Sequence, residues 1–119
     1  MSTTAIICEM NPLHLGHAYI LQEIKKTSDC VIAIMSGNFV QRGMPAIIDK
    51  SYRAQAAVLS GADLVLELPV TVALSSAEGF AAGGVEILSK FCDYLCFGCE
   101  TGSEEVLMGT AKALLSEEF

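Results

Sequence analysis

Two histidines spaced three residues apart, His14 and His17, are suited to chemistry on a phosphate. They flank Gly16 in a short stretch between the apolar run 5–8 and an amphipathic run that begins near Ala18. This order predicts a strand, a tight loop and the N-terminus of a helix. Such an N-terminus presents unpaired N–H groups and a positive dipole end, which favour a phosphate. Imidazole N–H groups can donate to phosphate oxygens as charge develops during transfer, so His14 and His17 are the candidate catalytic residues.

The same stretch has a simpler interpretation, in which the histidines only cap the helix or shape the turn. Their spacing, the strand-to-helix position and Gly16 favour the phosphate site instead. Gly16 would let the backbone approach a ligand closely, and Pro12 would fix the turn. The P-loop pattern G-x-x-x-x-G-K followed by Ser or Thr does not occur in the sequence.

Apolar and amphipathic runs alternate along the whole chain. The apolar runs predict strands at 5–9, 30–35, 64–68 and 94–97, and the amphipathic runs predict helices at 16–27, 49–59 and 75–91 and a last helix that follows the turn at 98–102 and ends at about 115. A repeated β-α order implies an α/β fold with a parallel sheet and right-handed crossovers. Ligands of such sheets bind beyond the carboxyl ends of the strands, where the loops after Glu9, Met35 and Phe97 would meet.

Capping signals set the expected helix ends. Asp49 is a plausible N-cap, Gly61 a plausible stop, and Ser75-x-x-Glu78 and Thr101-x-x-Glu104 are possible capping boxes. The apolar positions expected to face the core are Ile20, Leu21 and Ile24 in the first helix, Val85, Leu88 and Phe91 in the third, and Val106, Leu107, Ala111 and Leu114 in the last.

The long loop from Ser36 to about Ile48 is a second candidate for function, because loops of this length in compact domains are usually functional. A solvated excursion is the alternative, but Phe39 and Val40 are apolar and would not favour water. Arg53 lies one turn inside the following helix. It could bind a phosphate, or it could be an ordinary surface charge or a partner of Asp49.

The bulk composition predicts one small folded domain, residues 1–119. Hydrophobic residues make up 52% of the chain, and the formal net charge is −7. An acidic domain is poorly suited to grip a nucleic-acid backbone alone. Apolar runs long enough to span a bilayer and a secretory leader are both absent from the sequence, which predicts a soluble cytoplasmic protein without membrane contact.

Five cysteines could suggest a metal site, since Cys92, Cys96 and Cys99 are closely spaced. A fourth ligand at recognisable spacing is missing. Buried structural thiols are the preferred interpretation, and the sequence assigns no protein metal site.

Four motifs together resemble one family. The residues Glu9-Met10-Asn11-Pro12-Leu13-His14-Leu15-Gly16-His17, Met35-Ser36-Gly37-Asn38-Phe39-Val40-Gln41-Arg42-Gly43, Glu67-Leu68-Pro69 and Cys96-Phe97-Gly98 are similar to those of bacterial tRNA-Met cytidine acetate ligases. These belong to the HxGH nucleotidylyltransferase superfamily. The resemblance implies a Rossmann-like, HUP-type fold with three α/β/α layers and about four parallel strands in the order 3-2-1-4, with strand one central.

The resemblance also implies a site. Residues expected to bind ATP are Ile7, Cys8, Glu9, Met10, Asn11, Pro12, Leu13, His14, Leu15, Gly16, His17, Ala18, Tyr19, Ile20 and Gly98. Residues expected to line the pocket of the acyl substrate are Ser36, Gly37, Asn38, Gln41 and Arg42. Simpler roles remain open: Glu9 could only end its strand, and Ser36, Gly37 and Gly98 could only form turns.

The implied reaction joins acetate to ATP, with Mg²⁺ expected at the phosphates, and passes the acetyl group to the wobble cytidine of elongator tRNA-Met. Family members are several times longer, so this chain would be a truncated form that lacks their second half. We expect it not to bind tRNA tightly and to self-associate through an exposed edge of the fourth strand. Two alternatives are an adenylyltransferase for another small substrate, against which the motif from Ser36 to Gly43 speaks, and an inactive nucleotide-binding module, which the missing half favours.

Overall fold

Four parallel strands form the sheet in the computed structural model, which describes residues 1–98 and 104–116. In the described part of the chain the strands are β1 (Thr3–Cys8), β2 (Cys30–Met35), β3 (Leu64–Glu67) and β4 (Tyr94–Cys96). Their order is β3-β2-β1-β4, with every pair parallel. The predicted fold class, strand order and central position of the first strand are therefore confirmed.

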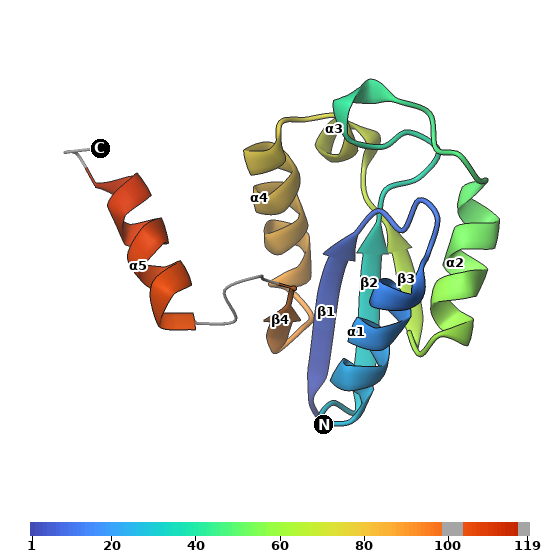
Figure 1. The fold of residues 1–119 in the computed structure, drawn as a ribbon, viewed down its shortest axis with the longest axis horizontal. Coiled ribbons are helices and arrows are strands. Elements are labelled where there is room, and N and C mark those ends of the chain that lie inside the picture. Colours follow the sequence, from blue (N-terminus) through green and yellow to red (C-terminus); the bar gives the residue numbers. More distant parts are fainter. Residues whose placement is uncertain (99–103, 117–119) are drawn as a thin grey trace.

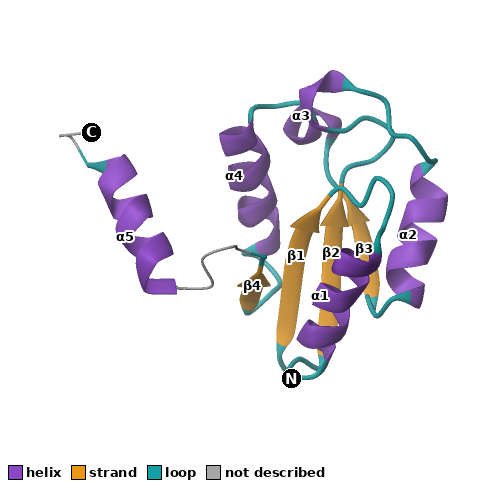
Figure 2. Ribbon diagram, viewed as in Figure 1, coloured by secondary structure: helices purple, strands orange, loops and turns teal. Residues whose placement is uncertain are grey.

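Helices cover both faces of this sheet (Figure 1). Helices α1 (Leu15–Lys25) and α2 (Lys50–Leu59) contribute to the core on one face, and α3 (Val70–Ala73) and α4 (Ala77–Leu88) to the core on the other. Figure 2 shows α1 crossing in front of the strands, with α2 beside β3 and α4 beside β1. The final helix, α5 (Glu104–Leu115), lies apart from the sheet beyond β4.

Side chains of the inner strands alternate between two cores, as a sheet buried on both faces requires. Ile6 and Cys8 face the core under α1 and α2, whereas Ala5 faces the core under α3 and α4. In α1, Leu21 and Ile24 are buried as predicted, and Ile20 packs half-buried against the same core.

Several element limits differ from the predictions. Helix α4 ends at Leu88 rather than residue 91, and its N-cap is Ser76, whose hydroxyl accepts from the Gly79 N–H at 3.1 Å. The Ser75 hydroxyl instead donates to the Val72 carbonyl at 2.6 Å, so it ends the short helix α3, which was not predicted. The predicted capping box at Ser75 is thus wrong by one residue.

The predicted inner faces of the last two helices are partly wrong. In α4, Leu88 is buried, but Val85 is exposed, and Phe91, which lies beyond the end of the helix, is exposed as well. Gly84 takes the contact with the sheet, since a Cβ there would lie 2.7 Å from the Ile7 Cδ1 atom.

In α5, Leu107 is half-buried, but Val106, Ala111 and Leu114 are exposed and the helix has no buried residue. An amphipathic pattern identifies the apolar face of a helix but not the surface that covers it. The predicted capping box at Thr101 includes residues outside the described part.

Candidate functional site

Two loops meet at the carboxyl edge of the sheet (Figure 1). We call residues 9–14, between β1 and α1, the first loop, and residues 36–48, after β2, the second loop. The strands behind them are neighbours, with Cys8 paired to Met35. The loop after β4 begins with Phe97 and Gly98 and continues into residues outside the described part. The predicted convergence of loops at this edge is therefore present for the first two.

The first loop is bent sharply where it leaves β1. Met10 has a φ of 48°, a conformation uncommon outside glycine, and its side chain is buried in the core below. A cis peptide joins Asn11 to Pro12. The Asn11 side-chain oxygen accepts from the Ile47 N–H at 2.8 Å, which ties this loop to the end of the second loop.

His14 and His17 cap α1 reciprocally. His14 Nδ1 accepts from the Gly16 N–H at 3.1 Å, and His17 Nδ1 accepts from the His14 N–H at 3.2 Å. The two rings stack with centroids 3.7 Å apart and an interplanar angle of 20°. In a neutral imidazole whose Nδ1 is an acceptor, Nε2 carries the proton. The cap therefore assigns both rings an Nε2–H donor.

Charge on His17 is disfavoured by its surroundings. Burial lowers the pKa of His17, and the neighbouring His14 lowers it further. His17 is half-buried and His14 is exposed. Two neutral N–H donors at a helix N-terminus can stabilise charge that develops on a phosphate oxygen.

Gly16 has a structural role in addition to the predicted close approach to a ligand, which stays a prediction. A Cβ at this position would lie 2.9 Å from the His14 Cε1 atom and 3.1 Å from its Nδ1 atom. The absence of a side chain at Gly16 therefore leaves the space that the His14 ring occupies. The glycine shapes the histidine pair directly, whether or not a ligand touches its backbone.

The remaining residues predicted to bind ATP fall into three groups. Ile7, Cys8 and Met10 place their side chains against the two cores. Exposed positions of the stretch are Pro12, Leu15, Tyr19 and Gly98, and half-buried ones are Asn11, Leu13, Ala18 and Ile20. A Cβ on Gly98 would lie 3.5 Å from the Ile20 Cδ1 atom, so the segment after β4 reaches the flank of α1. A shared ATP site of these two segments stays a prediction.

Glu9 stands just beyond β1 and connects the two loops. Its Oε2 atom accepts from the Ser36 hydroxyl at 3.1 Å and from the Gln41 N–H at 2.8 Å. The carboxylate is thus already engaged twice within the protein. Glu9 does more than end the strand, and a direct contact between its side chain and ATP stays a prediction.

Arg53 is the clearest correction at this edge. It was expected to be a surface charge, a partner of Asp49 or a phosphate ligand, but its side chain is 1% exposed. Its guanidinium donates to the carbonyl groups of Glu9, Ser36, Gly37 and Ile48. The Asp49 carboxylate instead accepts from Ser51 as the N-cap of α2. The sequence could not reveal partners contributed by two distant loops.

The five residues predicted to line the substrate pocket do not all come together. Ser36 and Gly37 line a cavity of about 140 Å³ beside α2. Asn38 and Arg42 are exposed, Gln41 is half-buried, and these three do not line that cavity. Arg42 has a φ of 73° within a 3₁₀ turn, Gln41–Gly43.

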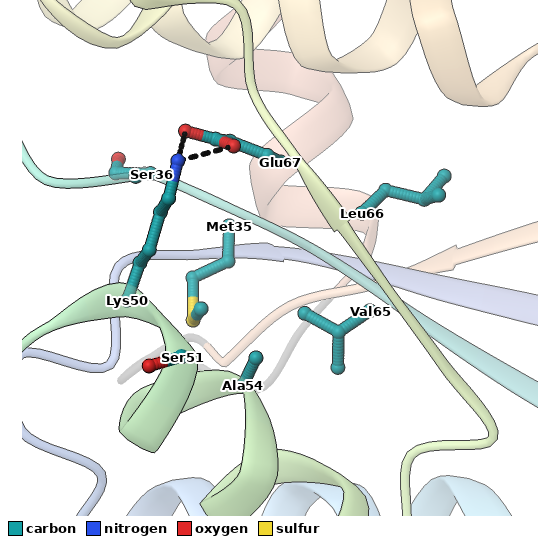
Figure 3. Close-up of a pocket in the computed structure, with 9 residues that line it drawn as sticks. Met35, Ser36, Lys50, Ser51, Ala54, Val65, Leu66 and Glu67 are labelled. Atoms are coloured by element: carbon teal, nitrogen blue, oxygen red, sulfur yellow. Dashed lines mark hydrogen bonds and ion pairs between the residues drawn. The ribbon is translucent and has the colours of Figure 1, made fainter.

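Lys50 and Glu67 were not among the site residues predicted from the sequence, although Glu67 belongs to one of the family motifs. Figure 3 shows them bridging one side of the cavity above Met35, Ala54 and Val65. Lys50 Nζ donates to both Glu67 carboxylate oxygens at 3.0 Å. The signal available was the glutamate that ends an otherwise apolar strand at the carboxyl edge.

A larger groove of about 1020 Å³ lies between α1, β4 and α5. Its lining includes Tyr19 and Ile20, which belong to the predicted ATP site, together with residues 94–97 and Leu107. The groove therefore adjoins the flank of α1 that Gly98 reaches.

Metal and membrane features are limited in the described residues. Residues 1–98 and 104–116 contain no group of three or more His, Cys, Asp or Glu side chains placed to hold a metal. Cys8, Cys30, Cys92 and Cys96 are free thiols, and burial raises the pKa of Cys8 to about 12. Cys99 lies outside the described residues. Within the same ranges no helix has the length and apolar character needed to cross a membrane.

Comparison with known families decides the relationship. Residues 1–119 match the family described as HIGH Nucleotidyl Transferase. The chain belongs to this family. It is 47% identical over 121 residues to the tRNA(Met) cytidine acetate ligase of Geobacillus sp. (strain WCH70), covering 99% of this chain and 30% of that protein. Its identity to the ligase of Caldanaerobacter subterraneus subsp. tengcongensis is 52%, covering 98% and 30%.

A solved structure is similar in the same region. Thermotoga maritima TmcAL bound with alpha-thio ATP has a TM-score of 0.90 and 43% sequence identity, covering 96% of this chain and 29% of that chain. These relatives confirm the family resemblance predicted from the motifs. The chain spans about 30% of the length of the curated relatives described here.

Proposed function

We propose that this chain binds ATP at residues 7–20 together with Gly98, with His14 and His17 donating to the phosphates. The observation that carries the proposal is the reciprocal cap, in which both Nδ1 atoms accept main-chain N–H groups and both Nε2–H groups remain as donors. The Thermotoga maritima relative bound with alpha-thio ATP supports this choice of nucleotide.

We further propose that the bound nucleotide activates acetate. A carboxylate oxygen of acetate would attack the α-phosphorus, the bond from that phosphorus to the β-phosphate bridging oxygen would break, and pyrophosphate would leave. The exocyclic amine of the wobble cytidine of elongator tRNA-Met would then attack the acetyl carbon, and the bond from that carbon to the phosphate oxygen of AMP would break. AMP would leave with that oxygen, and the amine would lose its proton to water. The names of the relatives support this assignment of acetate and tRNA. The proposed place of action is the cytoplasm.

Positioning and charge stabilisation would supply most of the catalysis in the first step. The acyl substrate is assigned to the side of the second loop, where Ser36 and Gly37 line the cavity beside Lys50. Asn38, Gln41 and Arg42 belong to this proposal only as residues of the same loop.

Mg²⁺ does not fit a resident protein site in the described residues, which offer no cluster of ligands. The Glu9 carboxylate already accepts two hydrogen bonds. The ion is therefore assigned to the triphosphate of the nucleotide, as is common for Mg²⁺, and no step is assigned to it here.

Exchange of radiolabelled pyrophosphate into ATP, with and without acetate, tests the proposed activation. Exchange that requires acetate supports it. Exchange that requires a different small carboxylate favours another adenylyltransferase, and ATP binding without any exchange favours an inactive nucleotide-binding module.

Self-association through β4 is also proposed, because Tyr94, Leu95 and Phe97 are exposed there. Sedimentation velocity over a range of protein concentrations tests this self-association, which predicts a sedimentation coefficient that rises with concentration.

A further inference from the structure

Arg53 is a charged side chain buried almost completely, and it is not assigned to the chemistry. It projects from α2, where it is 1% exposed. A buried cation is costly unless its donors are all used. Within the described residues every buried side-chain N or O atom has a hydrogen-bond partner.

The partners of Arg53 come from both loops of the site. Nη1 donates to the carbonyl of Glu9 at 2.7 Å and to that of Ser36 at 3.1 Å, while Nη2 donates to the carbonyl of Gly37. Nε donates to the carbonyl of Ile48 at 3.0 Å. Glu9 begins the first loop, Ser36 and Gly37 begin the second loop, and Ile48 ends it.

The Glu9 side chain makes a second connection between the same segments. Its carboxylate accepts from the Ser36 hydroxyl and the Gln41 N–H. The Arg53 guanidinium and the Glu9 carboxylate also attract each other: burial lowers the pKa of Arg53, and Glu9 is the largest influence that raises it. Main chain and side chain of Glu9 are thus both fixed against the second loop.

We infer that Arg53 is a positioning residue that holds the first loop in register with the second loop, so that the proposed ATP site and the proposed acyl site form together. The role as stated rests on the proposed ATP site. A guanidinium suits it because its planar fork reaches several carbonyl groups at fixed angles, whereas a lysine ammonium is a single point of charge. Without Arg53, four carbonyl groups at the sheet edge would lose a donor.

Arg53→Lys in the full chain tests this inference, with Lys90→Met as the exposed matched control. Three amides report on the loops, because the N–H groups of Gln41, Ala46 and Ile47 are bonded to Glu9, Asn38 and Asn11. We expect their hydrogen exchange to accelerate at least about tenfold. Exchange of the β2 amides should stay within about twofold of the unmodified chain.

ATP titration of the same variants gives the second readout. The titrations are made at a temperature well below the thermal midpoint of Arg53→Lys. We expect the Kd for ATP to rise at least about tenfold in Arg53→Lys and to stay unchanged in Lys90→Met. Acceleration spread evenly over loops and β2, or an unchanged Kd, would overturn the inference. If the unmodified chain binds no ATP, the proposed function fails, while the exchange experiment still tests the connection between the loops.

A measurement on the unmodified chain covers the case in which Arg53→Lys does not fold. The chain has two arginines, so their Nε–H nuclear magnetic resonance signals can be assigned with Arg42→Lys. We expect the Arg53 signal to exchange slowly with water and to shift when ATP is added. Exchange as fast as that of Arg42, or no shift at saturating ATP, would show that Arg53 does not position the site.

Discussion

The imidazole rings of His14 and His17 stack 3.7 Å apart while each accepts a main-chain N–H through Nδ1. The same atoms therefore cap α1 and fix the rings that present Nε2–H groups. Stability and nucleotide binding are coupled at this point of the fold. Variants that keep the cap and remove the rings can separate the two.

The pH dependence of stability gives one test of this pair. The pKa of His17 is lowered from 6.5 in the folded chain by burial and by His14. The unfolded chain then takes up the proton more readily, so the stabilising contribution is full above pH 6.5 and is lost as pH falls toward the folded pKa. The urea midpoint of unfolding should be lower at pH 5.5 than at pH 7.5 in the unmodified chain, and this difference should be smaller in His17→Gln.

The carboxylates with lowered pKa values, such as Asp63, titrate below this window and leave the comparison clear. An identical loss of stability in His17→Gln between those two pH values would contradict the assignment of this contribution to His17.

Gly16→Ala should weaken ATP binding with little change in stability. The new methyl group would displace the His14 ring. Loss of the cap costs about 0.5–2 kcal/mol, whereas alanine in a helix is favoured over glycine by about 1 kcal/mol. These terms nearly cancel in the free energy of unfolding, but the ring is misplaced. We expect the Kd for ATP to rise at least about tenfold.

Gly109→Ala is the matched control for this change, because a Cβ there meets no atom within 4 Å in α5. It should raise stability by about 0.5–1 kcal/mol and leave ATP affinity unchanged. If Gly16→Ala binds ATP as tightly as the control, the glycine does not serve the His14 ring.

Gly37→Ala should affect the acyl side of the site alone. A Cβ at Gly37 would meet the Glu67 carboxylate, with the Cδ atom 2.9 Å away. Glu67 is exposed and can swing into solvent, which breaks an ion pair with Lys50 worth about 0–1 kcal/mol. In acetate-dependent pyrophosphate exchange, the KM for acetate should change at least about threefold with the Kd for ATP unaltered. An unchanged KM would remove the cavity from the proposal.

tRNA should bind this chain weakly by itself. The net charge is −7, and several basic side chains are already engaged: Lys25 with Asp63, Lys26 with Glu23, and Lys50 with Glu67. A gel-shift titration with elongator tRNA-Met should give a Kd above about 1 µM at physiological salt. Tighter binding that survives this salt concentration, or acetylated cytidine from this chain alone, would refute the prediction.

The strands of the sheet could be predicted from the sequence because segments such as 30–35 are continuously apolar and alternate with helices. The order of the strands came from the family resemblance. The sequence placed His14, Gly16 and His17 at a helix N-terminus for the same local reason. The burial of Arg53 could not be predicted from local patterns, since its hydrogen-bond partners are carbonyl groups from segments up to 44 residues away. A charge inside an amphipathic helix is usually solvated, and only the closure of two loops over it makes burial favourable.

The packing of α5 was missed for a related reason. Its apolar positions follow a helical period, but periodicity carries no information on whether a neighbouring surface is present. The ion pair of Lys50 and Glu67 also depends on the three-dimensional structure, because α2 and β3 bring together two residues that are 17 positions apart in the sequence. Local patterns therefore predicted the elements, whereas long-range contacts determined which side chains reach the site.

Calorimetric titration of ATP with Mg²⁺ into the unmodified chain and into the double variant His14→Asn, His17→Gln tests the central claim most directly. Asparagine is a favoured N-cap and glutamine at the third helical position keeps the capping box, so α1 should stay folded. We expect saturable binding by the unmodified chain and at least about a hundredfold loss in the variant, with thermal midpoints that differ little. Equal binding by both proteins would contradict the claim that the histidine pair holds the nucleotide phosphates.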